Sequence, residues 1–128
     1  MEVPILKQGP YLIASIQSAL SDADLVQLRD KLVEQVGHLR SRGVIVDVTA
    51  LDVMDSFATR TLRDITFMIR LRGAETVIVG IQPDVAFTMV QLGLKLEGVP
   101  TALDLEEGIA FLSKKDNGAN KEAAPRGR

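Results

Sequence analysis

"VIVDVTALDVMDSFATRTLRD", residues 44–64, is the stretch that decides how the whole chain folds. Its first five residues are almost all apolar and do not alternate, which is typical of a strand covered on both faces of a sheet. From Ser56 onward, apolar residues recur at intervals of three and four, as on the inner face of a helix. These residues are Ala58, Leu62, Ile65 and Ile69. A buried strand that runs into a helix over residues 56–71 predicts an α/β unit.

Further strands are expected on both sides of this unit. Two short apolar runs, residues 5–6 and 11–16, are separated by "KQGP", whose glycine and proline favour a tight reversal of the chain. The runs therefore predict an opening hairpin. "ETVIVG", residues 75–80, repeats the signature of a buried strand, and a shorter strand is expected around residues 99–102.

A long helix is expected between the hairpin and the central strand. Leucines and valines recur at helical spacing across residues 21–42 and form one apolar stripe. Ser21, with Asp24 three residues later, predicts a capping box at the start. The two arginines near the end suit the negative pole of a helix, and we expect Gly43 to provide its left-handed exit.

Two more helices are expected in the second half of the chain. The third covers residues 82–93, with Pro83 in its first turn, where a missing N–H costs nothing, and Gly93 as its terminator. The last begins with acidic residues in its first turn, capped by either Thr101 or Asp104.

The expected order of elements is β-β-α-β-α-β-α-β-α, and this order predicts one α/β domain. The sheet should be mixed and mostly parallel, with an N-terminal hairpin, and packed by about four α-helices. We expect this domain to cover residues 1–113. Residues 114–128 contain almost no apolar side chains to bury, so we expect a disordered C-terminal tail there.

The composition excludes several classes of function. With 15 basic and 17 acidic residues, the formal net charge of −2 offers no footprint for nucleic acid or an anionic membrane. The chain has no cysteine and one histidine, so neither a disulfide nor a cysteine-rich metal site can form. The N-terminal segment has no signal-peptide pattern, and no apolar run approaches the ~18 residues of a membrane span. We therefore expect a cytoplasmic protein with no metal and no cofactor.

The motifs of common enzymes are also missing, so we expect no catalytic residues. The sequence has no phosphate-binding glycine loop, no HExxH and no GxSxG. His38 falls on the polar side of its predicted helix and is expected to be solvated. Asp47 ends the central strand, where receiver domains carry a phosphate-accepting aspartate, but the first strands lack the acidic residues that would hold magnesium. A small enzyme or nucleotide-binding domain with an unfamiliar site stays the least favoured alternative.

Ser56 has two interpretations that do not exclude each other. A serine at a helix start is most often a cap. The same position suits a phosphate, because helix N-termini carry free N–H groups and a positive dipole, and Arg60 lies one turn further on. A phosphate there would change the exterior beside Asp55 while leaving the helix intact. Thr59, expected on the same side, is a weaker second candidate for modification.

The stretch of residues 44–64 resembles the strand, loop and helix signature of STAS domains, the family of bacterial anti-anti-sigma factors. Ser56 falls on the phosphoacceptor position of that signature. The likeness covers residues 3–112. Within the family, the chain is most similar to the small antagonists of the bacterial stressosome. This likeness is carried by "VPILKQGPYLIASIQ", "MDSF", "LRGAETVIVGIQPDVAFTMVQLG" and "TALDLEEGI".

This resemblance implies a non-enzymatic scaffold that forms homo- and hetero-oligomers with sensor proteins bearing homologous STAS domains. It also implies that the scaffold sequesters a serine/threonine kinase, that phosphorylation of Ser56 releases the kinase, and that a phosphatase resets the site. The implied partner-binding residues are Asp55, Phe57, Thr59 and Arg60. The alternative within the same fold is a freestanding anti-anti-sigma factor that binds an anti-sigma kinase directly.

Overall fold

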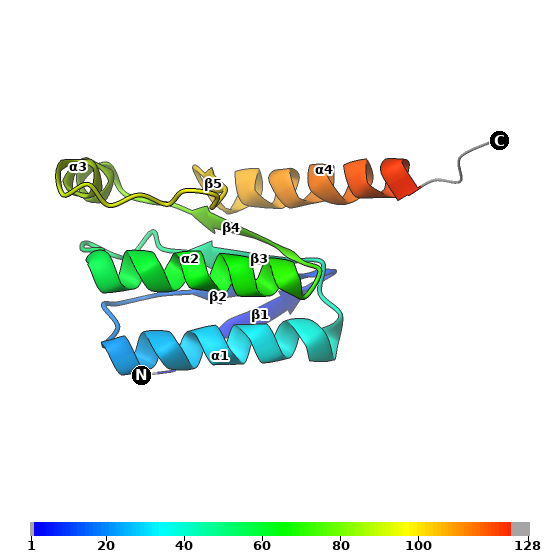
Figure 1. Ribbon diagram of the computed structural model, residues 1–128, viewed down its shortest axis with the longest axis horizontal. Helices are drawn as coiled ribbons and strands as arrows, with labels where there is room; N and C mark the ends of the chain where they lie inside the picture. The colour runs from blue at the N-terminus through cyan, green and yellow to red at the C-terminus, as the bar shows by residue number, and fades with distance from the viewer. Residues whose placement is uncertain (1, 124–128) are drawn as a thin grey trace.

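The computed structural model describes residues 2–123, within which one sheet is packed by helices (Figure 1). The strands are β1 (Ile5–Gln8), β2 (Tyr11–Ser15), β3 (Gly43–Asp47), β4 (Glu75–Val79) and β5 (Thr101–Ala102). The helices are α1 (Asp22–Leu39), α2 (Ser56–Leu71), α3 (Pro83–Gln91) and α4 (Leu105–Ala123). The predicted order of elements is confirmed, and α2 has the predicted bounds.

The sheet keeps its strands in chain order, from β1 at one edge to β5 at the other. β1 pairs antiparallel with β2, and the other neighbours pair in parallel. The predicted mixed, mostly parallel sheet with an N-terminal hairpin is therefore confirmed. Each parallel strand needs a crossover to reach the next one, and α1, α2 and α3 supply these crossovers.

Two cores, one on each face of the sheet, bury the central strand. Val44 and Val46 of β3 belong to the larger core, which α1 and α2 cover. Ile45 points to the other face and joins a smaller core with Val77 and with Leu112 of α4. Burial on both faces explains why the run of residues 44–48 is apolar without alternation.

The capping box at the start of α1 is confirmed, but the predicted end of the helix is wrong. The Asp24 N–H donates to Ser21 Oγ at 3.1 Å, and the Ser21 N–H donates to Asp24 Oδ2 at 3.3 Å. At the other end Arg40, not Gly43, takes the left-handed conformation, with φ 49°. Arg42 lies beyond the helix, and its N–H donates to the Pro10 carbonyl oxygen at 2.8 Å.

Gly43 has a packing role instead of a capping role. It is the first residue of β3, and a Cβ atom added there would lie 2.8 Å from Cδ1 of Leu112. Such a distance is too short for carbon atoms, so a side chain at Gly43 would force the buried Leu112 side chain to shift.

The start of α4 and the C-terminal segment settle two further expectations. The Glu107 N–H donates to Asp104 Oδ1 at 2.9 Å, so Asp104 is the cap, while Thr101 lies in β5. The helix continues to Ala123, so residues 114–123 are helical and the disordered tail predicted for them differs from the structure. Arg42 Nη1 lies 3.5 Å from Asp116 Oδ1 and links this extension to the sheet. Residues 124–128 lie outside the described residues.

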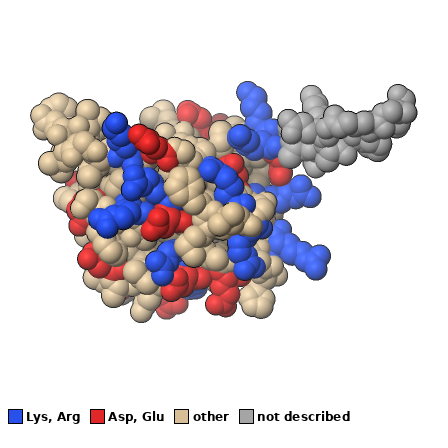
Figure 2. Space-filling model, in the orientation of Figure 1, with Lys and Arg blue, Asp and Glu red and all other residues tan. Residues whose placement is uncertain are grey.

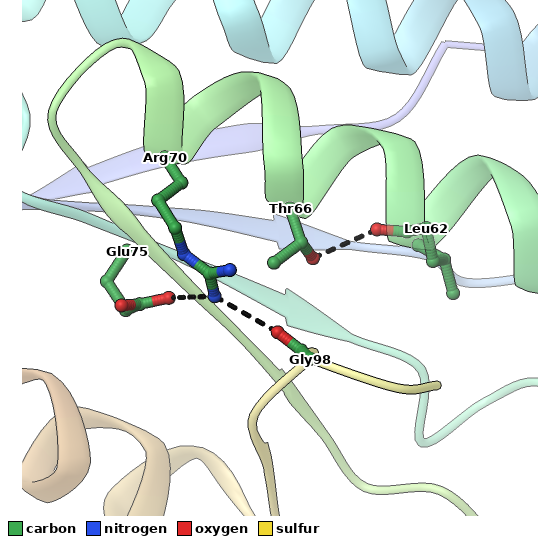
Figure 3. Close-up of polar contacts among 5 residues, drawn as sticks. All are labelled: Leu62, Thr66, Arg70, Glu75 and Gly98. Carbon is green, nitrogen blue, oxygen red and sulfur yellow. Dashed lines mark hydrogen bonds and ion pairs between the residues drawn. The ribbon is translucent and has the colours of Figure 1, made fainter. Parts of the chain in front are cut away.

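Side chains near the C-terminal end of α2 hold the helix against the sheet (Figure 3). Arg70 Nη2 donates to Glu75 Oε1 at 2.9 Å and to the Gly98 carbonyl oxygen at 3.0 Å. The buried Thr66 hydroxyl donates to the Leu62 carbonyl oxygen at 2.9 Å. Arg70 thus ties the helix to β4 and to the loop before β5, whereas the Thr66 hydrogen bond lies within α2.

Within residues 2–123, no helix combines the length and the apolar character needed to cross a membrane.

We predict that the smaller core depends on Leu112, which is 2% exposed. Leu112→Ala should lower the free energy of unfolding by about 2–5 kcal/mol, because it leaves a cavity under α4. Leu103→Ala is the matched control, since Leu103 is 74% exposed and its truncation should change stability by less than about 0.5 kcal/mol. Urea denaturation followed by circular dichroism measures both, and equal stability of the two variants would contradict this account of the smaller core.

Candidate functional site

The start of α2 lies at the end of the sheet where the parallel strands have their carboxyl ends. Figure 1 shows that α1 also begins at this end and that α3 lies beside it. In open α/β sheets, binding sites form at this end because the loops that follow the strands converge there. We call this end the switch end. Ser56 is the first residue of α2 and is exposed.

Asp55, and not Ser56, caps α2. The Asp55 backbone is extended, and its Oδ1 accepts a hydrogen bond from the Ala58 N–H at 2.8 Å. Within the described part of the chain, the Ser56 hydroxyl makes no hydrogen bond. The interpretation of Ser56 as the cap is therefore wrong, and its hydroxyl stands at the helix start without a structural partner.

The loop between β3 and α2 is tied down by polar contacts. Asp47 Oδ1 accepts from the Thr49 N–H at 2.9 Å and from the Thr49 hydroxyl at 2.6 Å. The Thr49 carbonyl oxygen accepts from Gln82 Nε2, just before α3, at 2.6 Å. Gly80, with φ +83°, leaves the space that the Thr49 side chain occupies. Asp47 therefore anchors the loop.

The prediction that Thr59 is exposed on the same side as Ser56 is wrong. Thr59 is 3% exposed, and its hydroxyl donates to the Asp55 carbonyl oxygen at 2.8 Å. Residues three apart lie on neighbouring parts of a helix surface, and Thr59 falls on the part that packs against the core. A buried, hydrogen-bonded hydroxyl is not accessible to a kinase or a partner in the folded state. Of the other predicted partner-binding residues, Asp55 and Arg60 are exposed and Phe57 is half-buried.

The charges around Ser56 are mixed. Asp52 and Asp55 are exposed in the loop that precedes Ser56, and the first turn of α2 contains no acidic residue. Arg60 is exposed and has no ion pair with any described residue. In Figure 2, acidic and basic side chains are interspersed over most of the visible face, and Lys and Arg prevail toward the end where the chain continues into the grey residues. No group of three His, Cys, Asp or Glu residues in the described chain could hold a metal ion.

Two features of the switch end were missed by sequence reasoning. Val53 is 69% exposed, although its loop neighbours Leu51 and Met54 are buried. Beside it lies a small hollow of about 80 Å³, which is lined by apolar side chains and by Asp55. The lining residues are Ile16, Ala19, Leu20, Leu25, Leu51, Val53, Asp55 and Ala58. No pattern in "LDVM" marks Val53 as exposed, because the burial of Leu51 and Met54 beside it depends on the packing of the whole domain.

The fold and the site define an α/β domain whose second helix begins with an exposed serine that does not cap the helix. Residues 2–108 match the profile of the STAS domain family, and the chain belongs to this family.

Similar proteins refine the comparison. Among solved structures, RsbS from Moorella thermoacetica carrying a serine-to-glutamate substitution is 35% identical, with a TM-score of 0.77 over 90% of this chain and 97% of that chain. A chain from the stressosome, described as a signal integration and transduction hub, is 33% identical, with a TM-score of 0.71 over 88% of this chain and 98% of that one. SpoIIAA, an anti-sigma factor antagonist, shares 14% identity and a TM-score of 0.66, which shows the fold alone.

Curated relatives include RsbRA of Bacillus subtilis (strain 168), an RsbT co-antagonist protein. It is 32% identical over 83 residues, which are 65% of this chain and 30% of that protein. The chain thus spans about 30% of the length of its RsbR relatives. Together these matches make the chain a stressosome-type STAS protein, similar to RsbS and RsbR.

We predict that Asp55 and Ser56 differ in their effect on stability. Asp55→Ala should lower the free energy of unfolding by about 1 kcal/mol, because the Ala58 N–H loses its acceptor. Ser56→Ala should change it by less than about 0.5 kcal/mol. Thermal and urea unfolding of both variants measure the difference. A larger loss for Ser56→Ala than for Asp55→Ala would mean that the serine, and not the aspartate, holds the helix start.

Proposed function

We propose that this chain is a non-enzymatic scaffold and antagonist of a bacterial stressosome. It holds a serine/threonine kinase at the switch end and releases the kinase when Ser56 is phosphorylated. The observation that carries this proposal is the exposed Ser56 hydroxyl, which is free of hydrogen bonds among the described residues, beside a helix cap made by another residue.

The helix start suits a phosphate. The first N–H groups of α2 and its positive dipole favour an anion, and Arg60, one turn further on, offers a cation for pairing. Because Asp55 provides the cap, a phosphate on Ser56 replaces no contact that the folded domain needs. Phosphorylation therefore adds roughly −1.5 to −2 charges to the exterior without unfolding the helix. The added charge therefore affects the binding of the kinase and not the fold of the domain.

Assembly with homologous STAS domains is the second part of the proposal. It is supported by the likeness to RsbS, to RsbR proteins and to a chain from the stressosome. Phe87 and Val90 of α3 and Leu92 after it are exposed apolar residues, which is consistent with a surface that other chains cover. The scaffold acts in the cytoplasm, and a phosphatase resets Ser56 after the stress has passed.

We predict that charge at Ser56 controls kinase binding. Ser56→Asp should weaken binding of the serine/threonine kinase partner, whereas Ser56→Ala should retain binding and prevent release when ATP is added. Calorimetric titration measures both affinities, and mass spectrometry after incubation with kinase and ATP locates the phosphate. Equal affinities of the two variants, or a phosphate on Thr59 and none on Ser56, would contradict the proposal.

Particle size separates the scaffold from the alternative of a freestanding anti-anti-sigma factor. Mixed with a sensor protein that bears a homologous STAS domain, the chain should elute from size-exclusion chromatography as a very large particle. Phe87→Glu should reduce that particle, because it places a charge on the exposed apolar residues of α3. Elution of the unaltered mixture as small separate proteins would favour the freestanding factor.

A further inference from the structure

We propose that the kinase is held at the switch end mainly by an apolar contact, in which Val53 and the hollow beside it receive an apolar side chain of the kinase. This inference rests on the proposed function of Ser56 and adds the chemistry of the contact. Val53 is then the residue that determines binding of the unmodified domain.

The negative charge that a phosphate on Ser56 adds favours an apolar contact with the kinase over a charged one. Asp52 and Asp55 are exposed just before Ser56. A kinase that bound these acids through lysines or arginines would be held more tightly after a phosphate was added, because the phosphate brings further negative charge. A contact through acidic groups would be opposed by the same two carboxylates before any modification. An apolar contact is weakened by the phosphate, because closing it would strip water from a charged group.

Val53 has the geometry of a preorganised apolar contact. It projects with 69% of its surface exposed, and buried Leu51 and Met54 fix the chain on either side of it. The Asp47 carboxylate and Gln82 hold Thr49 at the beginning of the same loop. Because the loop is already fixed, a partner loses little conformational freedom of this chain on binding, which favours affinity.

The hollow gives the partner a place to insert a side chain. It lies where the starts of α1 and α2 approach each other, and residues of both helices and of both preceding loops line it. Asp55 is the one charged residue in its lining, and one of its carboxylate oxygens already accepts a hydrogen bond from the Ala58 N–H. An apolar side chain of small size therefore matches the hollow better than a polar one.

Arg60 is the alternative contact. A carboxylate of the kinase could pair with Arg60 and lose this partner to the phosphate, which would also produce release. The two contacts respond differently to salt, because an exposed ion pair is screened and an apolar contact is not.

The test is a titration of the purified kinase with the full chain, without ATP, at about 50 mM and about 500 mM salt. Val53→Ala should weaken binding about tenfold, since two buried methyl groups are lost from the contact. Leu71→Ala is the matched control, because Leu71 is an exposed apolar residue at the opposite end of α2, and it should bind like the unaltered chain. Affinity of the unaltered chain should change by less than about twofold between the two salt concentrations.

The inference is overturned if Val53→Ala binds like the unaltered chain, or if Arg60→Gln weakens binding more than Val53→Ala and the affinity falls steeply with salt. Ser56→Asp, measured in the same series, separates this outcome from failure of the proposed function. If Ser56→Asp weakens binding and Val53→Ala does not, only the apolar contact is wrong. If Ser56→Asp binds like the unaltered chain, the proposed function itself is wrong. Far-ultraviolet circular dichroism of each variant confirms that it is folded.

Discussion

The 2.8 Å hydrogen bond from the Ala58 N–H to the Asp55 carboxylate determines what the switch end can do. It fixes the start of α2, so the hydroxyl of the next residue, Ser56, is not needed to cap the helix. The Thr59 hydroxyl completes the arrangement by donating to the Asp55 carbonyl oxygen from inside the domain. Two side chains thus hold the helix start, and a third displays its hydroxyl to solvent. If the serine were the cap, its modification would alter the helix itself.

The topology of the sheet explains why acidic residues gather at the same end. Parallel strands joined by helices place the helix N-termini together, and acidic residues in a first turn complement the helix dipole. Asp22 and Asp24 occupy the first turn of α1, and Asp84 occupies that of α3. α2 differs, because its first turn contains no acidic residue and begins with Ser56. At this helix start the anion is the carboxylate of the Asp55 cap, and a phosphate on Ser56 would add further negative charge beside it.

Sequence reasoning predicted most of the fold because the deciding signals are local. The bounds of α2 follow from apolar spacing, and the capping box of α1 follows from two residues three positions apart. The end of α1 was missed because the glycine at position 43 makes room for Leu112 and does not end the helix. This contact joins distant parts of the chain, so no local pattern reveals it. The helical extension of α4 was missed because its composition resembles a polar tail, whereas the contact of Arg42 with Asp116 joins its first part to the sheet.

The candidate site was predicted less completely than the fold. Ser56 was identified from its place between strand and helix. The sequence could not show whether Asp55 or Ser56 caps the helix, because aspartate and serine are both good caps. That depends on which side-chain oxygen accepts the Ala58 N–H. Thr59 was predicted to be exposed because residues three apart lie on the same side of a helix, but on α2 Ser56 lies at the exposed edge of that side and Thr59 at its buried edge. Val53 was missed because an isolated valine in a loop gives no sign of exposure until its neighbours are known to be buried.

The contacts of the loop bear on how the proposed phosphorylation of Ser56 would act. Thr49 is bound to Asp47 on one side and to Gln82 on the other, and Gly80 leaves room for it. A hydrogen bond therefore joins the loop before α2 to the residue just before α3. Close packing opposes small continuous shifts, so under the proposed function we expect a phosphate on Ser56 to leave the surrounding backbone in place. Under the proposed function, the domain would then signal its state through the charge and hydration of its surface, because the hydrogen bonds around Ser56 hold the neighbouring backbone in place.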